Sequence, residues 1–385
     1  MEKRAKNSKE KKKKKFLAFC LFVFTFIGGW LIEKIIDEVI GKPVDTVLEY
    51  AFDETDAILK SSYNAMNKYL YKNTLKNIRT KAQEGDTIAQ YNLGVMYYFG
   101  KNVTKNYKEA ITWFRKAAEQ EYASAQFYLG LIYSYGYGVT QDYKEAIKWY
   151  RKAAEQGDAS AQNNLGKMYE NGKGVEQNYK EAVRWFRKSA EQGEAYAQQS
   201  LGFMYENGYG VAQDSKEAVN WYRKAAEQEY RLAQCALGLM YSKGKGVTQD
   251  YKEAITWFRK SAAQEYDVAQ YELGLMYYNG WGVEQNYKEA VNWYRKAAEQ
   301  GNANAQCNLG GMYYHGWGIR ADNSEAFKWW RRSAEQGHST AQYNLGLMYY
   351  YGTGVKKDKK EAIKWLRKAA EQEYESAKKM LKQLK

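Results

Sequence analysis

The apolar and polar positions of the chain recur with a period of 36 residues between residues 85 and 372. Three markers keep this step: an Ala-Gln pair that first occurs at Ala89, a glycine that first occurs at Gly94, and a tryptophan that first occurs at Trp113. Each marker occurs eight times. A fixed period of this length is typical of stacked supersecondary units, so the pattern predicts an all-α solenoid of eight helix-turn-helix repeats.

Each repeat divides into two predicted helices, as residues 121–156 illustrate. Apolar side chains fall at helical spacing in the first half, and Gly136-Tyr137-Gly138 ends this helix because glycine tolerates a positive φ. Asp142 is the expected N-cap of the second helix, since its carboxylate can accept hydrogen bonds from free backbone N–H groups. The repeat is therefore predicted to be a helical hairpin.

The small and large residues of the hairpin have different predicted packing roles. Gly130 and Ala146 stand where the two helices can approach closely, because a longer side chain there would push them apart. Trp149 and Tyr150 supply large apolar surfaces that a single hairpin cannot bury. We therefore expect the stability of the chain to come from the stacking of neighbouring repeats.

The recurring string A-x-A-Q-x-x-L-G-x-M-Y-x-x-G-x-G-V-x-x-D-x-x-E-A-x-x-W-x-x-K-A-A-E-Q-G resembles the Sel-1-like repeat, a relative of the tetratricopeptide repeat. Residues 157–192 match it almost throughout, and the resemblance extends over residues 85–372. It implies an α-solenoid that works as an adaptor in complex assembly, envelope processes or contact with a host. In the tetratricopeptide relatives, the first helix of each repeat lines the concave face, which is where we expect a partner to bind.

The resemblance assigns candidate binding residues to this face. Positions that vary among repeats while their neighbours stay constant are expected to face solvent, although aromatic residues at helical spacing are also typical of a core. The two ends of the face are aromatic and its middle is acidic, which would suit a partner segment with apolar ends and a Lys or Arg between them. The candidates are Tyr91, Tyr98, Phe99, Phe127, Tyr135, Glu170, Glu206, Tyr271, Tyr278, Tyr314, Tyr343, Tyr350 and Tyr351.

A second candidate surface is the loop edge, where Trp281 and Trp317 stand between loop glycines. Tryptophan is favoured in binding hot spots, so both residues are candidate partner contacts. The alternative is that they stack on adjacent loops, and the sequence leaves both interpretations open.

The N-terminal residues predict a membrane anchor. Residues 1–15 contain nine Lys or Arg and two Glu, a net charge of +7, and residues 16–32 carry no charge and just reach the length of a membrane-spanning helix. Because basic flanks stay cytoplasmic, residues 1–15 are expected to be a cytoplasmic tail and the repeats to lie on the periplasmic or extracytoplasmic side of the inner (plasma) membrane. The alternative is a cleaved signal peptide and a secreted chain, but the residues after Gly28-Gly29 offer no good cleavage site.

The remaining segments have simple predicted roles. Residues 33–84 are expected to form a helical spacer and an N-terminal cap, and residues 85–372 the eight repeats. Residues 373–385 are expected to form a C-terminal capping helix whose lysines keep its outer face polar.

Candidate chemistry is sparse. The two histidines, His315 and His338, belong to different helix ends, and no cluster of ligands has metal-site spacing, so neither a metal nor a cofactor is expected. Cys235 and Cys307 lie two repeats apart, too far for a disulfide at about 10 Å per helical layer, so both are expected to be free thiols. The chain thus departs from the cysteine-rich secreted branch of the family and from the β-lactamase label of that branch.

These observations together predict a non-enzymatic, membrane-anchored scaffold that binds a protein or peptide and not nucleic acid. One alternative is a hydrolase directed at the cell wall, for which no nucleophile–base pair is recognisable in the sequence. The other is a cytosolic scaffold whose basic tail binds acidic surfaces.

Overall fold

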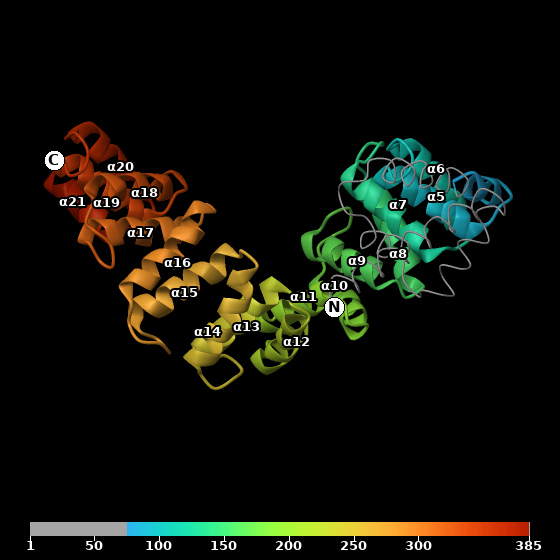
Figure 1. Ribbon diagram of the computed structural model, residues 1–385, viewed down its shortest axis with the longest axis horizontal. Coiled ribbons are helices and arrows are strands. Elements are labelled where there is room, and N and C mark those ends of the chain that lie inside the picture. The colour runs from blue at the N-terminus through green and yellow to red at the C-terminus, as the bar shows by residue number, and fades with distance from the viewer. Residues whose placement is uncertain (1–74, 385) are drawn as a thin grey trace, which may run out of the picture. The chain divides into compact units, whose positions relative to one another are not determined.

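The computed structural model describes residues 75–384, and the regular elements of this part of the chain are all α-helices (Figure 1). The described residues divide into two compact units, residues 75–125 with 137–139 and residues 126–136 with 140–384. The predicted tail and anchor, and most of the predicted spacer, lie outside the described residues. Between residues 75 and 384, no helix combines the length and the apolar character that crossing a bilayer requires.

Each unit consists of helical hairpins. The first unit contains helical residues 75–83, α5 (Thr87–Phe99) and α6 (Tyr107–Glu119). With α5 and α6 as repeat 1, the first helices of repeats 2 to 8 are, in order, α7 (Ala123–Tyr135), α9 (Ala159–Asn171), α11 (Ala195–Asn207), α13 (Arg231–Lys243), α15 (Asp267–Asn279), α17 (Ala303–His315) and α19 (Ser339–Tyr351). Their second helices are α8 (Tyr143–Glu155), α10 (Tyr179–Glu191), α12 (Ser215–Glu227), α14 (Tyr251–Ala263), α16 (Tyr287–Glu299), α18 (Asn323–Glu335) and α20 (Lys359–Glu371), and α21 (Glu375–Gln383) follows them.

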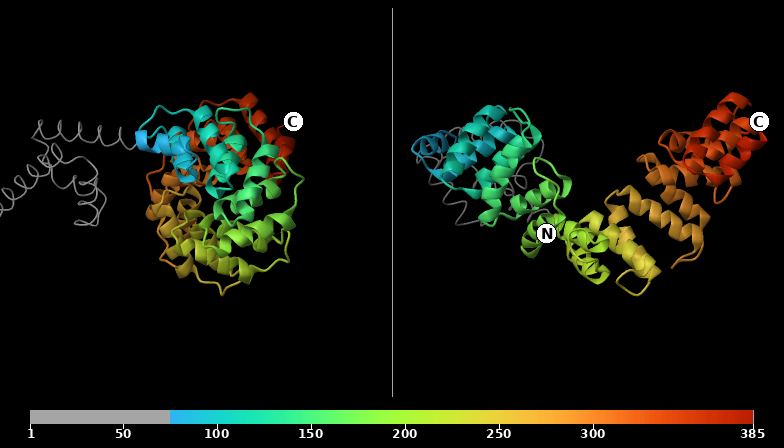
Figure 2. Two further views of the ribbon diagram at one scale, coloured as in Figure 1. Left: turned by 90° about the vertical axis from the view of Figure 1, so that its right-hand side faces the viewer. Right: turned by 180° about the vertical axis from the view of Figure 1, so that it is seen from behind.

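In the second unit, the hairpins from α9 to α20 lie one after another, as Figure 2 shows from behind. The all-α solenoid of helical hairpins predicted from the 36-residue period is therefore confirmed for the described residues.

The helix boundaries follow from caps that the sequence made recognisable. Asp142 Oδ1 accepts hydrogen bonds from the backbone N–H groups of Lys144 (2.9 Å) and Glu145 (3.0 Å), as expected for the N-cap of α8. At the C-terminal end of α7, Gly136 has a φ of 71° and its N–H donates to the carbonyl oxygen of Ile132 at 2.8 Å. The predicted division of the repeat into two helices is therefore confirmed.

Within each hairpin, a large side chain of the second helix packs against a glycine of the first. A Cβ atom added to Gly130 would lie 2.5 Å from Cδ1 of Tyr150, and one added to Gly202 would lie 2.7 Å from Cδ1 of Tyr222. The same close contact occurs in all eight repeats, with Phe, Tyr, Trp or Leu as the large side chain. The predicted close approach at Gly130 is confirmed, and the group that approaches is a ring.

The hydrophobic core lies between repeats rather than inside one hairpin. One cluster contains Tyr222 of α12, Leu237 and Met240 of α13, and Trp257 of α14. Trp329 of α18 shares a cluster with Tyr294 of α16 and Leu309 of α17 in the same way, so in both cases the tryptophan, its own first helix and the preceding second helix form one core. This arrangement confirms that the tryptophans join neighbouring hairpins, because no hairpin completes such a cluster alone.

A ladder of glutamines satisfies the polar groups that this packing buries. Gln198 is 4% exposed, and its Nε2 donates to the carbonyl oxygen of Ala190 at 3.2 Å. Its Oε1 accepts a hydrogen bond of 2.8 Å from Nε2 of Gln228, which also donates to the carbonyl oxygen of Gly193 at 2.9 Å. The glutamine–glutamine bond recurs in each of the eight repeats. Buried amides paired in this way stabilise one fixed register of stacking.

Arginines form a second set of links between neighbouring repeats. Arg187 of α10 donates to the hydroxyl of Tyr205 on α11 at 2.6 Å, and Arg259 of α14 donates to Tyr277 on α15 at 2.8 Å. Each link joins a second helix to the first helix that follows it. The same bond reaches Tyr97, Tyr169, Tyr241 and Tyr313, whereas Arg331 of α18 donates to Glu335 of its own helix instead.

The connection between repeats gives a first testable prediction. Glu229 and Glu265 are exposed and have φ values of 62° and 58°, a left-handed conformation that strains any residue with a Cβ atom, whereas Gly301 occupies the same repeat position. The double variant Glu229→Gly, Glu265→Gly should raise the free energy of unfolding by about 1 kcal/mol, because the relief of strain exceeds the added flexibility of the unfolded chain. Urea unfolding followed by circular dichroism measures the change. The matched variant Gly301→Glu should lower stability, and a destabilised double variant would contradict the prediction.

His338 gives a second prediction. Its Nδ1 accepts a hydrogen bond of 3.3 Å from the backbone N–H of Ala341, and burial lowers the pKa of His338 below its ordinary value. The folded chain thus favours neutral imidazole, so the stability from this cap is present above the unfolded pKa of about 6.5 and is lost as the pH falls below it. Between pH 7.5 and pH 5.5, the melting temperature should fall further for the natural chain than for His338→Asn, because Asn302 makes the same cap at 2.9 Å without titrating. Equal pH dependence of the two proteins would show that His338 is not responsible.

Candidate interaction surface

The first helices of the second unit present one side to solvent, which we call the first-helix face. It consists of the side chains at the fifth, ninth and twelfth residues of each first helix, which helical spacing places together. On α15 these are Tyr271, Leu275 and Tyr278, all half-buried. The fifth residue is buried where it is Asn163, Cys235 or Cys307, so the face is only partly accessible.

The first-helix face changes character along the chain. In repeats 3 and 4 it carries Lys167, Glu170 and Glu206, whereas in repeats 6 to 8 none of its residues is charged. The uncharged members are Tyr271, Leu275, Tyr278, Cys307, Gly311, Tyr314, Tyr343, Leu347 and Tyr350. The same positions of repeat 5 are Cys235, Leu239 and Ser242, so the charge-free stretch runs over four successive first helices.

Aromatic rings at repeats 6 and 7 form a connected cluster. Trp317 stacks on Tyr287, with ring centroids 5.8 Å apart and planes at 18°, and its centroid lies 5.9 Å from that of Tyr278. His315 stacks on Trp317 at 4.5 Å, and Tyr314 meets His315 edge-on at 5.0 Å. We call these five residues the aromatic cluster. Tyr314 and Trp317 remain 40% and 39% exposed, so the cluster is ordered by its own contacts and still offers ring surface to a partner.

Trp281 shows the same stacking one repeat earlier. Its ring lies 5.6 Å from that of Tyr251 at an interplanar angle of 13°, and the residue is 42% exposed. Of the two interpretations left open by the sequence, the structure shows stacking, but on the first residue of the preceding second helix rather than on a loop. Tyr209 stacks on Tyr179 in the same way at 5.0 Å. The stacking leaves part of each ring accessible, and a role in binding stays a prediction.

The sequence analysis missed Tyr287 and His315, which hold Trp317 in place. A signal was present in the pairing of two repeat positions. Four second helices that begin with tyrosine are followed in the loop of the next repeat by an aromatic residue, as Tyr287 is by Trp317. The second helix that begins with Ser215 is followed there by Lys245. Lys245 Nζ instead lies 3.9 Å from the carboxylate of Glu206.

The predicted aromatic residues of repeat 1 form a comparable group in the first unit. The ring of Tyr98 lies 4.9 Å from that of Phe99 and 5.5 Å from that of Tyr107, on which Tyr137 stacks at 5.1 Å. Tyr91 packs against Phe114 and Tyr122, with centroids 6.0 and 5.0 Å away. Phe99 is 51% exposed, so this group also presents ring surface.

The other predicted aromatic residues divide between packing and exposure. Phe127 lies 6.0 Å from the ring of Tyr150, Tyr271 lies 6.0 Å from that of Tyr294, and Tyr343 lies 5.2 Å from that of Tyr374. Tyr350 and Tyr351 meet edge-on at 4.9 Å. Tyr135 and Tyr351 are largely exposed. As expected from the sequence, some of these residues pack inside the stack and others face solvent.

The two predicted acidic residues differ in their surroundings. Glu206 accepts a hydrogen bond of 2.8 Å from the hydroxyl of Tyr222, so its carboxylate is already engaged inside the chain. Glu170 lies near Lys167, and burial raises the pKa of its carboxyl group while Lys167 acts in the opposite direction. Lys167 Nζ also lies 3.3 Å from the ring centroid of Tyr196. The charges in the middle of the face are therefore partly compensated within the chain.

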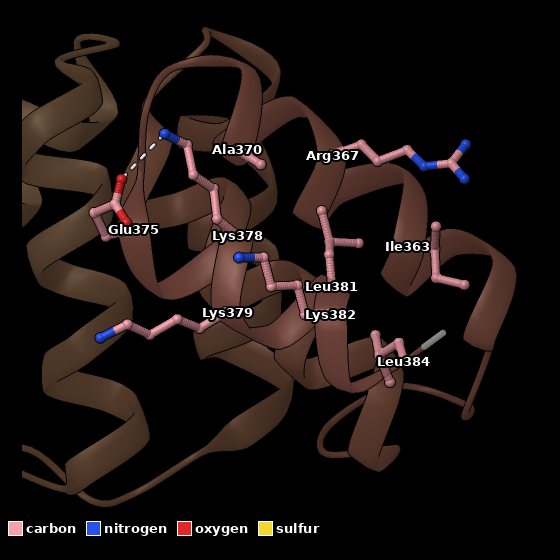
Figure 3. Close-up of a pocket in the computed structure, with 9 residues that line it drawn as sticks. All are labelled: Ile363, Arg367, Ala370, Glu375, Lys378, Lys379, Leu381, Lys382 and Leu384. Carbon is pink, nitrogen blue, oxygen red and sulfur yellow. Dashed lines mark hydrogen bonds and ion pairs between the residues drawn. The ribbon is translucent and has the colours of Figure 1, made fainter.

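A hollow of about 570 Å³ lies between α20 and α21 at the C-terminal end of the second unit (Figure 3). Its lining includes Arg367, Lys378 and Lys379. Lys378 donates to Glu375 at 3.0 Å, and Figure 3 shows Arg367 and Lys379 extending away from each other. The positive charges do not converge on one point, so the hollow lacks the geometry of an anion site.

The described residues offer little reactive chemistry. Between residues 75 and 384, no group of three His, Cys, Asp or Glu side chains is placed to hold a metal ion. Cys235 and Cys307 are free, as predicted, and both are buried. Burial raises the pKa of each thiol to about 12, so both stay protonated at neutral pH and are poor nucleophiles.

Two solved structures resemble this chain over most of its length. One is a protective antigen of uropathogenic Escherichia coli strains that displays an SLR fold; it is 44% identical, with a TM-score of 0.71, over 79% of this chain and 65% of that one. The other is a Sel1 repeat protein from Oxalobacter formigenes, 34% identical with a TM-score of 0.64, over 83% of this chain and 93% of that one.

A sequence relative has been found in a virus. The putative sel1-like repeat-containing protein L18 of Acanthamoeba polyphaga mimivirus is 35% identical over 83 residues, which are 21% of this chain and 13% of the viral protein. The matched part of this chain thus spans less than two thirds of the length of both the viral protein and the E. coli antigen.

The Sel1 repeat pattern itself matches eight consecutive segments, which begin two residues after the boundary expected from the sequence. They are residues 87–122, 123–158, 159–194, 195–230, 231–266, 267–302, 303–338 and 339–374. These segments account for most of the sequence, and the hairpins, glycine contacts and tryptophan positions recur in each of them. The chain belongs to the Sel1 repeat family.

Proposed function

We propose that the chain is a membrane-anchored scaffold that holds a segment of a partner protein against the first-helix face of its repeats. The observation that carries this proposal is the uncharged face of repeats 6 to 8 together with the aromatic cluster beside it. Exposed Tyr and Trp rings that are already fixed by stacking lose little conformational freedom on binding, and such residues dominate the energy of protein interfaces. A stack of helical repeats also offers an extended surface rather than a deep pocket, which suits a polypeptide ligand.

The second part of the proposal concerns location. The net charge of +7 on residues 1–15 and the uncharged run of residues 16–32 favour an anchor with its N-terminus in the cytoplasm and the repeats outside it. A relative of the same fold is a protective antigen of uropathogenic E. coli, which fits repeats that face away from the cytoplasm. In this arrangement the scaffold would gather its partner on the outer side of the inner membrane.

Topology can be tested directly. The full chain, expressed in E. coli, should be digested by protease added to intact spheroplasts, because its repeats would then be accessible from outside. An antibody against residues 375–384 detects the loss on a blot, and a cytoplasmic protein in the same sample controls for lysis. Repeats that survive until the membrane is disrupted would contradict the proposed orientation.

The binding face can be tested by photo-crosslinking in the cells that carry the gene. A benzoylphenylalanine in place of Tyr314 should crosslink to a partner protein, because this ring is exposed beside the aromatic cluster. The same probe at Lys328 of α18, whose side chain is 60% exposed, serves as the matched control and should give no such adduct. Adducts from Lys328 alone would move the binding site to the second helices, and the absence of adducts from both positions would contradict the scaffold.

A further inference from the structure

The ninth residue of α17 is Gly311, in the middle of a helix where glycine is a poor choice. Glycine loses more backbone freedom than any other residue when a helix forms. The other seven first helices carry a side chain at this position: Val95, Leu131, Lys167, Phe203, Leu239, Leu275 and Leu347. Repeat 7 therefore departs from a rule that the rest of the chain follows.

Packing inside the chain does not explain Gly311. A Cβ atom added there would meet no heavy atom within 4 Å, whereas one added to its neighbour Gly310 would lie 2.6 Å from Cδ1 of Trp330. Gly310 is thus required by the hairpin and Gly311 is not. Leu239 and Leu275 each pack against a core cluster that includes residues of the following repeat. Gly311 has no side chain with which to make this contact. A residue that weakens its own helix without an internal reason points to a role outside the chain.

The absent side chain leaves a notch in the uncharged part of the first-helix face. By repeat position, Leu275 and Leu347 flank it on the neighbouring first helices α15 and α19, which lie on either side of α17 (Figure 1). Cys307 stands one turn before Gly311 on the same helix, and Tyr314 stands one turn after it. The notch therefore opens beside the exposed rings of Tyr314 and Trp317.

The charges around the notch limit what can occupy it. No residue of the first-helix face in repeats 6 to 8 is charged, and the adjacent Glu272 is largely buried, with the pKa of its carboxyl group raised by burial. A Lys, Arg, Asp or Glu pressed onto this surface would lose water without gaining a counter-charge. The occupant that matches the surface in charge is an uncharged segment.

The shape of the notch favours a backbone over a helix. A glycine admits the close approach of another main chain, and a notch one side chain deep is narrow beside a helix of about 10–12 Å diameter. Extended polyproline II segments dock on surfaces lined by aromatic rings, where prolines lie on the rings and tyrosine or tryptophan groups donate to the carbonyls.

We propose that the Gly311 notch and the aromatic cluster bind an extended, uncharged, proline-containing segment of a partner protein. The main chain of the segment crosses Gly311, and its prolines lie on Tyr314 and Trp317. A second copy of this chain does not supply the segment, because its single proline, Pro43, follows a lysine in a sequence rich in charge. This inference rests on the proposed scaffold function and specifies the partner of the same face.

The test uses a library of random ten-residue peptides displayed on phage and selected against the full chain in detergent. Selection should enrich uncharged peptides that contain proline. Gly311→Leu, which restores the residue found at the equivalent positions 275 and 347, should raise the melting temperature while it weakens the binding of the enriched peptides at least tenfold. Gly311→Ala should lie between the two proteins in both measurements. Lys328→Leu introduces the same side chain on the second helix α18 of the same repeat, where the Lys328 side chain is 60% exposed, and should leave peptide binding unchanged.

The outcomes separate this inference from the scaffold itself. If Gly311→Leu is more stable and binds the selected peptides as well as the natural chain does, the notch is not the site. Loss of peptide binding in the double variant Tyr278→Ala, Tyr314→Ala would in that case still support binding by the first-helix face. If both Gly311→Leu and Gly311→Ala melt at a lower temperature, Gly311 serves internal packing and the inference fails. Enrichment of charged peptides without proline would contradict the proposal that an uncharged, proline-containing segment binds here. No enrichment over the empty support would contradict both the notch and peptide binding by the face.

Discussion

The whole structure depends on a contact that no repeat can make alone. Within the second unit, core clusters join three successive helices, as Tyr222, Leu237 and Trp257 do in one cluster and Tyr294, Leu309 and Trp329 do two repeats later. Within a repeat, the glycine of the first helix admits the large side chain of the second, which brings the helices close enough for this stacking. Because the core lies between repeats, the positions that serve it stay apolar in every repeat, although the large side chain against the glycine varies among Phe, Tyr, Trp and Leu.

The parts of the fold that could be predicted from the sequence are those decided by steric fit within a short stretch. The roles of Gly130, Asp142 and Trp149 could be predicted because small size and capping ability act locally, and because the large apolar tryptophan recurs every 36 residues. The glutamine ladder could not be foreseen, since its bonds join residues 30 positions apart and a glutamine in a polar helix gives no sign that it is buried. The predicted repeat boundary also lay two residues before the first helical residue, because glycine marks the end of a helix more clearly than alanine marks the start of one.

The candidate site could be predicted only in outline. Variable aromatic positions on the first helices were recognisable, and the structure shows exposed rings such as Tyr314 and Tyr351 among them. The sequence did not reveal which rings fix one another, because Trp317 is held by Tyr287 from the preceding repeat and by His315 from its own. Nor did it show that Glu206 is bound by Tyr222, which makes it a less available charge than its position suggested. Pairings across the stack become visible only when the register between repeats is known.

The stacked pairs at the loop edge also bear on how such an array can change its length. A core that uses the same residues at every interface allows recombination to remove or duplicate a whole 36-residue unit without leaving an unmatched apolar surface. The loop pairs are less interchangeable. Loss of repeat 3 would bring Tyr209 to Tyr143, ring to ring, but loss of repeat 5 would bring Trp281 to Ser215, which has no ring to stack on. The core thus permits copying and deletion of repeats, whereas stacking at the loop edge is kept only when particular repeats are neighbours.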